Sequence, residues 1–236
     1  MPVAVITGAS RGLGAALAQE LDHRGWTLVL DARDPETLAH ATAGLRHAHP
    51  LPGDVTDPVH RAELVAAAAQ HGGADVLVNN ASTLGASPLP PVVDIADEVL
   101  LDVYRTNVLA PHALTRALLP QLLEHRGRLV NISSDAAVEA YEGWGAYGSS
   151  KAALDHLTAI LAEEQPALRV YSVDPGDMRT RMHQDAFPGE DISDRPEPAT
   201  VAPRLLALLE GDLTSGRYRA ADLFAPAAPA ATEASA

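Results

Sequence analysis

Three residues that can carry or transfer protons lie close together in the second half of the sequence. Tyr147 and Lys151 are four residues apart, and Ser134 precedes the tyrosine by 13 residues. On a helix, positions i and i+4 share a face. A lysine ammonium there would favour tyrosinate and lower the phenol pKa from its usual value of about 10. Such a phenol is a general acid or base near neutral pH, although a lone Tyr-x-x-x-Lys also occurs in ordinary helices.

A glycine-rich segment near the N-terminus predicts an anion-binding turn. Val3–Ile6 is an apolar run typical of a buried strand, the sequence Thr-Gly-Ala-Ser-Arg-Gly-Leu-Gly follows it, and a helical pattern continues from there. Amide groups and the helix dipole at such a turn both favour a phosphate. Glycines let the backbone approach a pyrophosphate. The spacing is Gly-x-x-x-Gly-x-Gly, and a glycine turn without a ligand is the alternative.

Strand and helix patterns alternate along the chain. We expect strands over residues 3–6, 27–30, 76–78, 128–132 and 169–173, and weaker ones over 47–51 and 217–220. We expect helices over residues 12–23, 35–46, 58–70, 96–125, 145–164 and 199–210. This alternation predicts an α/β fold with a single doubly wound parallel sheet of the Rossmann type and helices on both faces. Ligands of such sheets bind beyond the carboxyl ends of the strands.

Length and composition are those of one globular domain. The chain has 236 residues, 47% of them hydrophobic, and no cysteine, which fits a reducing compartment. We assign residues 1–224 to the domain and residues 225–236 to a mobile Ala/Pro-rich tail. The N-terminal residues lack the pattern of a secretory leader, so we expect a cytoplasmic protein. The net charge of −14 argues against nucleic acid and anionic membranes as partners.

Several motifs follow one another in an order that resembles a known family. They are Thr7 to Gly14, Asp54-Val55, Asn79-Asn80-Ala81, Asn107, Ser134, Tyr147, Lys151, Pro175-Gly176 and Thr180. From Val3 to about Asp222, the chain resembles a short-chain dehydrogenase/reductase of the standard single-domain branch. One position departs from the family pattern, because Ser82 stands where the family has glycine. The resemblance implies an oxidoreductase that moves a hydride between a nicotinamide cofactor and a carbonyl compound or secondary alcohol.

The resemblance also implies roles for single residues. The catalytic tetrad would be Asn107, Ser134, Tyr147 and Lys151, where Asn107 marks a helix kink and holds a water that relays protons to the lysine. The cofactor-binding residues would be Gly8, Ser10, Arg11, Gly12, Leu13, Gly14, Arg33, Asp54, Val55, Asn80, Ala81, Tyr147, Lys151, Pro175, Gly176, Met178 and Thr180. No metal site is implied. A structural role for Asn107 and a helix cap for Asp54 are the alternatives, although Asp57 before Pro58 fits a cap better.

The residues after the second strand bear on the choice between NADP(H) and NAD(H). In relatives that prefer NAD, an acidic residue at this strand end bonds the adenosine ribose. Here that position is Ala32, and Arg33 and Arg11 are placed to hold a 2′-phosphate. We therefore expect NADP(H), with NAD(H) as the alternative. Asp31 is the complication, because a register shift of one residue would bring its carboxylate to the ribose and favour NAD(H).

Two segments are expected to line the substrate pocket. Residues between Ser134 and Tyr147 contribute Val138, Tyr141, Glu142 and Trp144, and residues after Thr180 contribute Met182, His183, Phe187 and Pro188. We assign the pocket to Tyr141, Trp144, Met182 and Phe187, which suits an apolar small-molecule carbonyl or alcohol. For Glu142 and His183, solvated surface positions are the alternatives. Residues 182–198 lack periodicity and resemble a lid that orders on binding.

Three functions are compatible with these motifs. The first is an NADP(H)-dependent carbonyl reductase or alcohol dehydrogenase, in which Tyr147 is the general acid or base. The second is a non-catalytic NADP-binding redox sensor or scaffold subunit, which would not need Ser134 or Tyr147. The third is a sugar-nucleotide epimerase or dehydratase, whose larger C-terminal substrate domain has no counterpart in the sequence after Gly176. The resemblance further implies a homodimer or homotetramer, with the helix over 145–164 packing on its copy.

Overall fold

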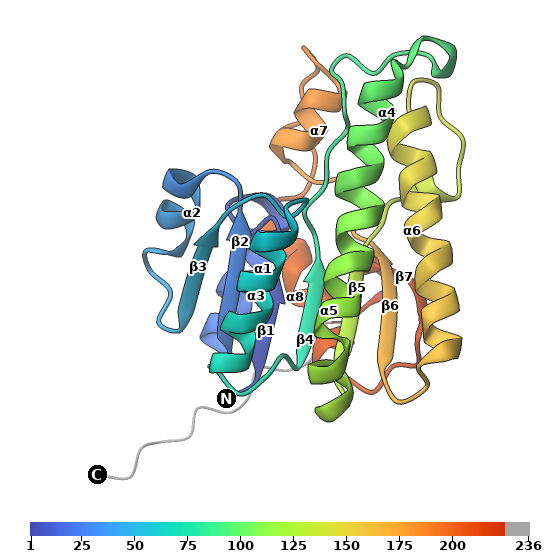
Figure 1. Ribbon diagram of the computed structural model, residues 1–236. Helices are drawn as coiled ribbons and strands as arrows, with labels where there is room; N and C mark the ends of the chain where they lie inside the picture. Colours follow the sequence, from blue (N-terminus) through green and yellow to red (C-terminus); the bar gives the residue numbers. More distant parts are fainter. Residues whose placement is uncertain (225–236) are drawn as a thin grey trace.

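The apolar runs form the strands of one parallel sheet, which the computed structural model shows within residues 1–224 (Figure 1). The strands are β1 (Val3–Ile6), β2 (Thr27–Ala32), β3 (Ala48–Pro52), β4 (Val76–Asn79), β5 (Arg128–Ile132), β6 (Arg169–Asp174) and β7 (Gly216–Arg219). Their order is β3-β2-β1-β4-β5-β6-β7, and each neighbouring pair is parallel. The predicted fold class is therefore confirmed. The chain reverses its direction across the sheet between β1 and β4, which is where ligands of such sheets bind.

Helices cover both faces of this sheet, as Figure 1 shows. They are α1 (Gly12–His23), α2 (Pro35–Thr42), α3 (Pro58–Gln70), α4 (Asp97–Tyr104), α5 (Ala110–Glu124), α6 (Gly145–Glu164), α7 (Arg181–Ala186) and α8 (Pro198–Leu209). Alternate residues of each strand point to opposite faces. Ala4 and Ile6 join a core with α1 and α8, whereas Val3 and Val5 join a second core with α3 and α5. Because both faces are covered, the five inner strands β1, β2, β4, β5 and β6 are buried almost throughout, which explains their apolar runs, whereas the edge strands β3 and β7 are partly exposed.

The long helix expected over 96–125 is divided by a wider turn. Residues Arg105–Leu109 form one π-helical turn between α4 and α5, and Asn107 lies within it. Such turns insert into α-helices often at functional sites. The helix kink implied for Asn107 is therefore present.

Other differences from the expected elements have local causes. Helix α2 ends at Thr42 instead of residue 46, and Gly44 follows it closely. Strand β3 contains Pro50 and Pro52 and lies at the sheet edge, where proline is tolerated. Helix α7 was not expected at all, since its six residues are too few to show a periodicity. The predicted mobile tail, residues 225–236, lies outside the described residues.

Candidate active site

The turn after β1 is packed so tightly that two of its positions accept only glycine. Gly8 has φ +67°, and a Cβ there would lie 2.9 Å from Cα of Ala81 in the loop after β4. A Cβ on Gly14 would lie 2.5 Å from the carbonyl oxygen of Gly8, so the turn closes only around glycine. Arg11 occupies the N-cap of α1, and its guanidinium has no acceptor atom. The first amides of α1 are thus left for an external acceptor such as a phosphate.

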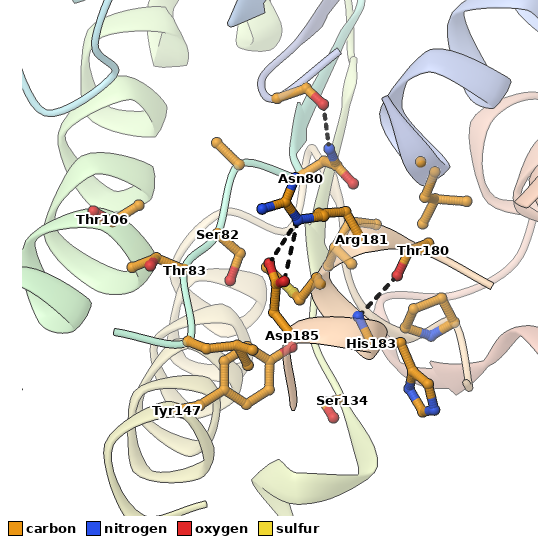
Figure 2. A pocket seen from close by; sticks show the side chains of 18 of the residues that line it. Asn80, Ser82, Thr83, Thr106, Ser134, Tyr147, Thr180, Arg181, His183 and Asp185 are labelled. Atoms are coloured by element: carbon orange, nitrogen blue, oxygen red, sulfur yellow. Dashed lines mark hydrogen bonds and ion pairs between the residues drawn. The ribbon is translucent and has the colours of Figure 1, made fainter. Parts of the chain in front are cut away.

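Hydrogen bonds tie this turn to the loop after β4. The hydroxyl of Thr7 accepts from the amides of Asn80 and Ala81, each at 3.0 Å. The side-chain amide of Asn80 donates to the carbonyl oxygens of Thr7 at 2.9 Å and of Gly8 at 3.1 Å. Figure 2 shows Asn80 at this junction. Asn80 and Ala81 therefore position the glycine turn as well as lining the cavity beside it.

Two exposed arginines line this cavity where the chain leaves β1 and β2. They are Arg11, which follows β1, and Arg33, which follows β2. Hydrogen bonds from Thr37 and the charge of Arg11 lower the pKa of Asp34. Burial alone would raise the pKa of Asp54, but hydrogen bonds from Thr56 and the charge of Arg33 outweigh this effect, so the pKa lies below its usual value. The charges of Arg11 and Arg33 thus act on carboxylates of the loops that follow β2 and β3, while their role in binding a 2′-phosphate stays a prediction.

Tyr147, Lys151 and Ser134 line the same cavity. Tyr147 and Lys151 lie on the first turns of α6, and Ser134 follows β5, which is three places from β2 in the sheet. Figure 2 shows Tyr147 and Ser134. Both α6 side chains are buried. The hydroxyl of Ser134 donates to Oδ1 of Asp135 at 2.8 Å and accepts from the amide of Ala136 at 3.2 Å. The predicted serine, tyrosine and lysine therefore meet at one place.

The prediction that Lys151 lowers the pKa of Tyr147 is wrong in this structure. Nζ of Lys151 donates to the carbonyl oxygen of Ile132 at 2.7 Å and lies 5.4 Å from the centre of the Tyr147 ring. Burial raises the pKa of Tyr147 above its usual range, and the Ser134 hydroxyl only partly offsets this increase. Desolvation outweighs the distant ammonium. Tyr147 is therefore protonated at neutral pH, in the form that donates a proton.

The buried ammonium of Lys151 should make stability depend on pH. Burial lowers the pKa of Lys151 from 10.5 to about 8. The unfolded chain then binds more protons between these two values, so the free energy of unfolding rises with pH across this window. We expect the stability of the native protein relative to Lys151→Met to increase by about 2 kcal/mol from pH 7 to pH 9.5. Urea unfolding of both cofactor-free proteins at the two pH values measures this, and a difference independent of pH would contradict it.

Asn107 makes four side-chain hydrogen bonds. Its amide donates to the Thr83 carbonyl oxygen at 2.9 Å and to the Ser150 hydroxyl at 3.0 Å. Its oxygen accepts from the Thr83 amide at 2.9 Å and from the Ser82 hydroxyl at 3.1 Å. The serine that replaces the family's glycine is thus bonded to Asn107. Asn107 fastens the loop after β4 to α6, which supports the structural alternative, while its part in a proton relay stays a prediction.

One cavity of about 970 Å³ contains nearly all the predicted site residues. Two lie behind its wall, because Gly14 packs on the glycine turn and Asn107 is buried between the β4 loop and α6. Among the predicted pocket residues, Tyr141, Trp144, Met182, Phe187 and His183 line the cavity. Val138 instead lines a separate hollow beside α6 and β7. Asp54 bonds the amide and hydroxyl of Thr56, and Asp57 caps α3 as expected.

Helix α7 forms one wall of the cavity next to Tyr147. The hydroxyl of Thr180 accepts from the His183 amide at 3.2 Å and thereby caps α7 (Figure 2). Trp144 lies 5.6 Å from the Tyr147 ring and 5.9 Å from the Phe187 ring, measured between ring centres. The segment predicted as a lid, residues 182–198, thus begins within α7, and Phe187 directly after this helix packs on Trp144, whereas residues 188–197 form turns and irregular structure.

Comparisons with known proteins agree with this site. Residues 2–191 match a family model described as short chain dehydrogenase. This chain belongs to the short-chain dehydrogenase family. A sepiapterin reductase of Xenopus laevis is 35% identical to it over 237 residues, which cover 88% of this chain and 90% of that protein. An uncharacterised oxidoreductase of Mycobacterium tuberculosis is 34% identical over 211 residues, which cover 86% of this chain and 79% of that protein.

Solved structures of short-chain dehydrogenases superpose closely on this one. A short-chain dehydrogenase of Escherichia coli complexed with NADPH gives a TM-score of 0.85 at 32% identity, covering 93% of this chain and 96% of that chain. One of Shigella flexneri complexed with NADP gives 0.85 at 31% identity, covering 93% and 97%. The chain is therefore an oxidoreductase of a family whose members bind nicotinamide cofactors.

The sequence analysis missed several residues that position the groups of this short-chain dehydrogenase. Arg217 of β7 donates to the Ser134 carbonyl oxygen at 2.8 Å and to Asp155 of α6 at 2.9 Å. Asp155 also accepts a hydrogen bond from Ser172. These pairs join residues up to 83 positions apart. Asp135 alone among the missed residues had a local signal, because it directly follows Ser134 in the sequence.

Proposed function

We propose that this short-chain dehydrogenase transfers a hydride between NADP(H) and a carbonyl compound or secondary alcohol, with Tyr147 as the general acid or base. One observation carries the proposal. The buried Tyr147 and Lys151 and the half-buried Ser134 line a cavity beside β5, and two exposed arginines line the same cavity beside β1 and β2. A nicotinamide near the tyrosine and a phosphorylated ribose near the arginines would span this cavity. A redox sensor or scaffold would not need the protonated phenol.

The side chains divide the work of reducing a carbonyl group. Bound NADPH would supply the hydride to the carbonyl carbon. Ser134 would then donate a hydrogen bond to the oxygen on which negative charge develops, because its hydroxyl can turn from Asp135 toward the pocket. Tyr147 would transfer its phenolic proton to that oxygen, which completes the alcohol and leaves NADP⁺. Lys151, held by the Ile132 carbonyl, would bond the ribose hydroxyls and favour the resulting tyrosinate.

The choice of NADP(H) is supported from two sides. Arg11 and Arg33 are exposed, and bidentate guanidinium groups suit a phosphate. The related structures from Escherichia coli and Shigella flexneri were solved with NADPH and NADP. Glycine at positions 8 and 14 permits the tightly packed turn after β1, which presents the first amides of α1 to a pyrophosphate. The residues present therefore fit the cofactor.

The substrate wall is mostly apolar and aromatic. Trp144, Phe187 and Met182 pack around Tyr147 together with Leu84 and Ala136. These groups favour an apolar or planar carbonyl compound, since aromatic faces bury such a surface well. Relatives named as sepiapterin reductase and as a polyketide ketoacyl reductase make reduction the direction to test first.

Spectrophotometry tests the proposed function. We expect absorbance of the reduced nicotinamide to fall when protein and NADPH are mixed with apolar ketones, aldehydes or quinones, and to fall at least tenfold more slowly with NADH. The sensor or scaffold function would be favoured if NADPH binds but the protein neither reduces any carbonyl compound in the panel nor oxidises the corresponding alcohols.

We also propose that the enzyme acts in the cytoplasm as a homodimer or homotetramer. Within residues 1–224, the longest helices fall short of the apolar length that crossing a bilayer requires. Leu101 of α4 and Leu157 and Ile160 of α6 are between 40% and 48% exposed. These two helices lie beside each other in Figure 1, so their exposed apolar side chains can meet a second copy.

A further inference from the structure

Three carboxylates line the cavity near the two arginines, where they would oppose a 2′-phosphate. They are Asp31, Asp34 and Asp54. Two of them are held by hydrogen bonds within their own loops. Asp34 accepts from the Thr37 amide at 2.7 Å, and Asp54 accepts from the Thr56 amide and hydroxyl, both at 2.8 Å. Each of these two carboxylates therefore has one oxygen, Oδ1, bonded within its own loop.

Asp31 is held by a residue of a different element. Nε2 of His60, on α3, lies 2.8 Å from Oδ1 of Asp31, where the ring N–H donates to the carboxylate. The side chains of Asp31 and His60 are only 3% and 5% exposed. A Cβ on Gly53, after β3, would collide with the imidazole, so the chain leaves room for the ring there. His60 thus turns the carboxylate into the protein, between β2 and α3.

The position of Asp31 gives this contact a consequence for cofactor choice. Asp31 and Ala32 are the last two residues of β2, and Arg33 follows them. A carboxylate at this end of a dinucleotide-binding sheet bonds the ribose hydroxyls of NAD and repels the phosphate of NADP. Burial raises the pKa of Asp31 to about 6, so the group is still mostly ionised at neutral pH. Without its contact to His60, the Asp31 carboxylate could reach the ribose whose 2′-phosphate Arg11 and Arg33 would bind.

We propose that His60 is a specificity-determining positioning residue, which holds the Asp31 carboxylate away from the adenosine ribose so that the protein prefers NADP(H). The inference rests on the proposed function only for the location of the 2′-phosphate between Arg11 and Arg33. His60 touches neither cofactor nor substrate in this proposal and acts through Asp31. Its removal changes the preference between two cofactors, whereas a purely structural residue would weaken both alike.

Dissociation constants for NADPH and NADH, measured by titration calorimetry, test this without any substrate. For His60→Leu we expect NADPH to bind at least tenfold more weakly and NADH to bind as well as before or better. Adding Asp31→Asn to His60→Leu should restore NADPH binding to within threefold of the native value. His60→Gln, which keeps a donor, should stay near the native ratio. Glu63→Gln serves as the matched control, because Glu63 is the exposed second partner of His60 at 3.4 Å.

Two results would overturn the inference. The first is equal weakening of both cofactors by His60→Leu, or no recovery in the double variant. The second is a tenfold loss of NADH binding in Asp31→Asn alone, which would place the native Asp31 carboxylate on the ribose. We expect Asp31→Asn to change neither dissociation constant by more than threefold. This variant keeps the test decisive if His60→Leu fails to fold. If replacing Arg33 by serine leaves NADPH binding unchanged, the proposed phosphate site has failed instead.

Discussion

Replacing Tyr147 with phenylalanine is expected to slow carbonyl reduction by at least about 100-fold while NADPH still binds. In the proposed mechanism the buried phenol donates the proton, and proton transfer by a positioned side chain contributes about 10²- to 10⁴-fold to a rate. The ring itself packs against Trp144 at 5.6 Å, and phenylalanine keeps that contact. Initial rates with NADPH, the dissociation constant for NADPH and the melting temperature together measure the effect.

Tyr104→Phe is the matched control for this substitution. Tyr104 ends α4, away from the cavity, and the same oxygen is removed there. The control should keep the native rate. Retention of more than a tenth of the turnover by Tyr147→Phe would remove the phenol from the mechanism. A large loss of NADPH binding in the same variant would mean that the phenol serves the cofactor and not the chemistry.

Replacing both Arg11 and Arg33 with serine is expected to weaken NADPH binding at least 100-fold and NADH binding less than threefold. A hydrogen bond to a charged group contributes about 1.5–3 kcal/mol, so two of them account for about 10²- to 10⁴-fold. Both arginines are exposed and line the cavity, so the native fold does not depend on burying them. Calorimetric titration with each cofactor provides the two constants.

Arg105→Ser is the control for this pair, because Arg105 is an exposed arginine on the π-helical turn and does not line the cavity. It should leave both constants unchanged. Equal weakening of NADPH and NADH by the double variant would show that the arginines bind the shared pyrophosphate. The preference for NADP(H) would then need another source.

The sequence predicted the elements whose signal is local. Strands such as Val3–Ile6 are continuous apolar runs because both faces of the sheet are covered, and the glycine turn follows directly from its residues. Helix α7 escaped prediction because its six residues depend on the Thr180 cap and on packing between Phe187 and Trp144. Short segments fixed by tertiary contacts give no periodic pattern to detect.

The same distinction applies to the site. Ser134, Tyr147 and Lys151 could be identified from their spacing, but the surroundings that set their pKa values could not. The lysine contact with Ile132 and the burial of the phenol arise from packing between α6 and β5. Arg217 and His60 were missed for the same reason, since each meets its partner across a long stretch of sequence. Spacing thus predicts which residues react, whereas packing decides their protonation and orientation.

The prolines of β3 also determine how the sheet can meet other chains. The Gly53 amide donates inward to Ala32, so the amide positions that alternate with it along β3 face outward, and Pro50 and Pro52 occupy two of them. Proline offers no donor, so this edge cannot template a further strand from a neighbouring molecule. An open parallel sheet is thereby protected at this edge against aggregation through strand pairing.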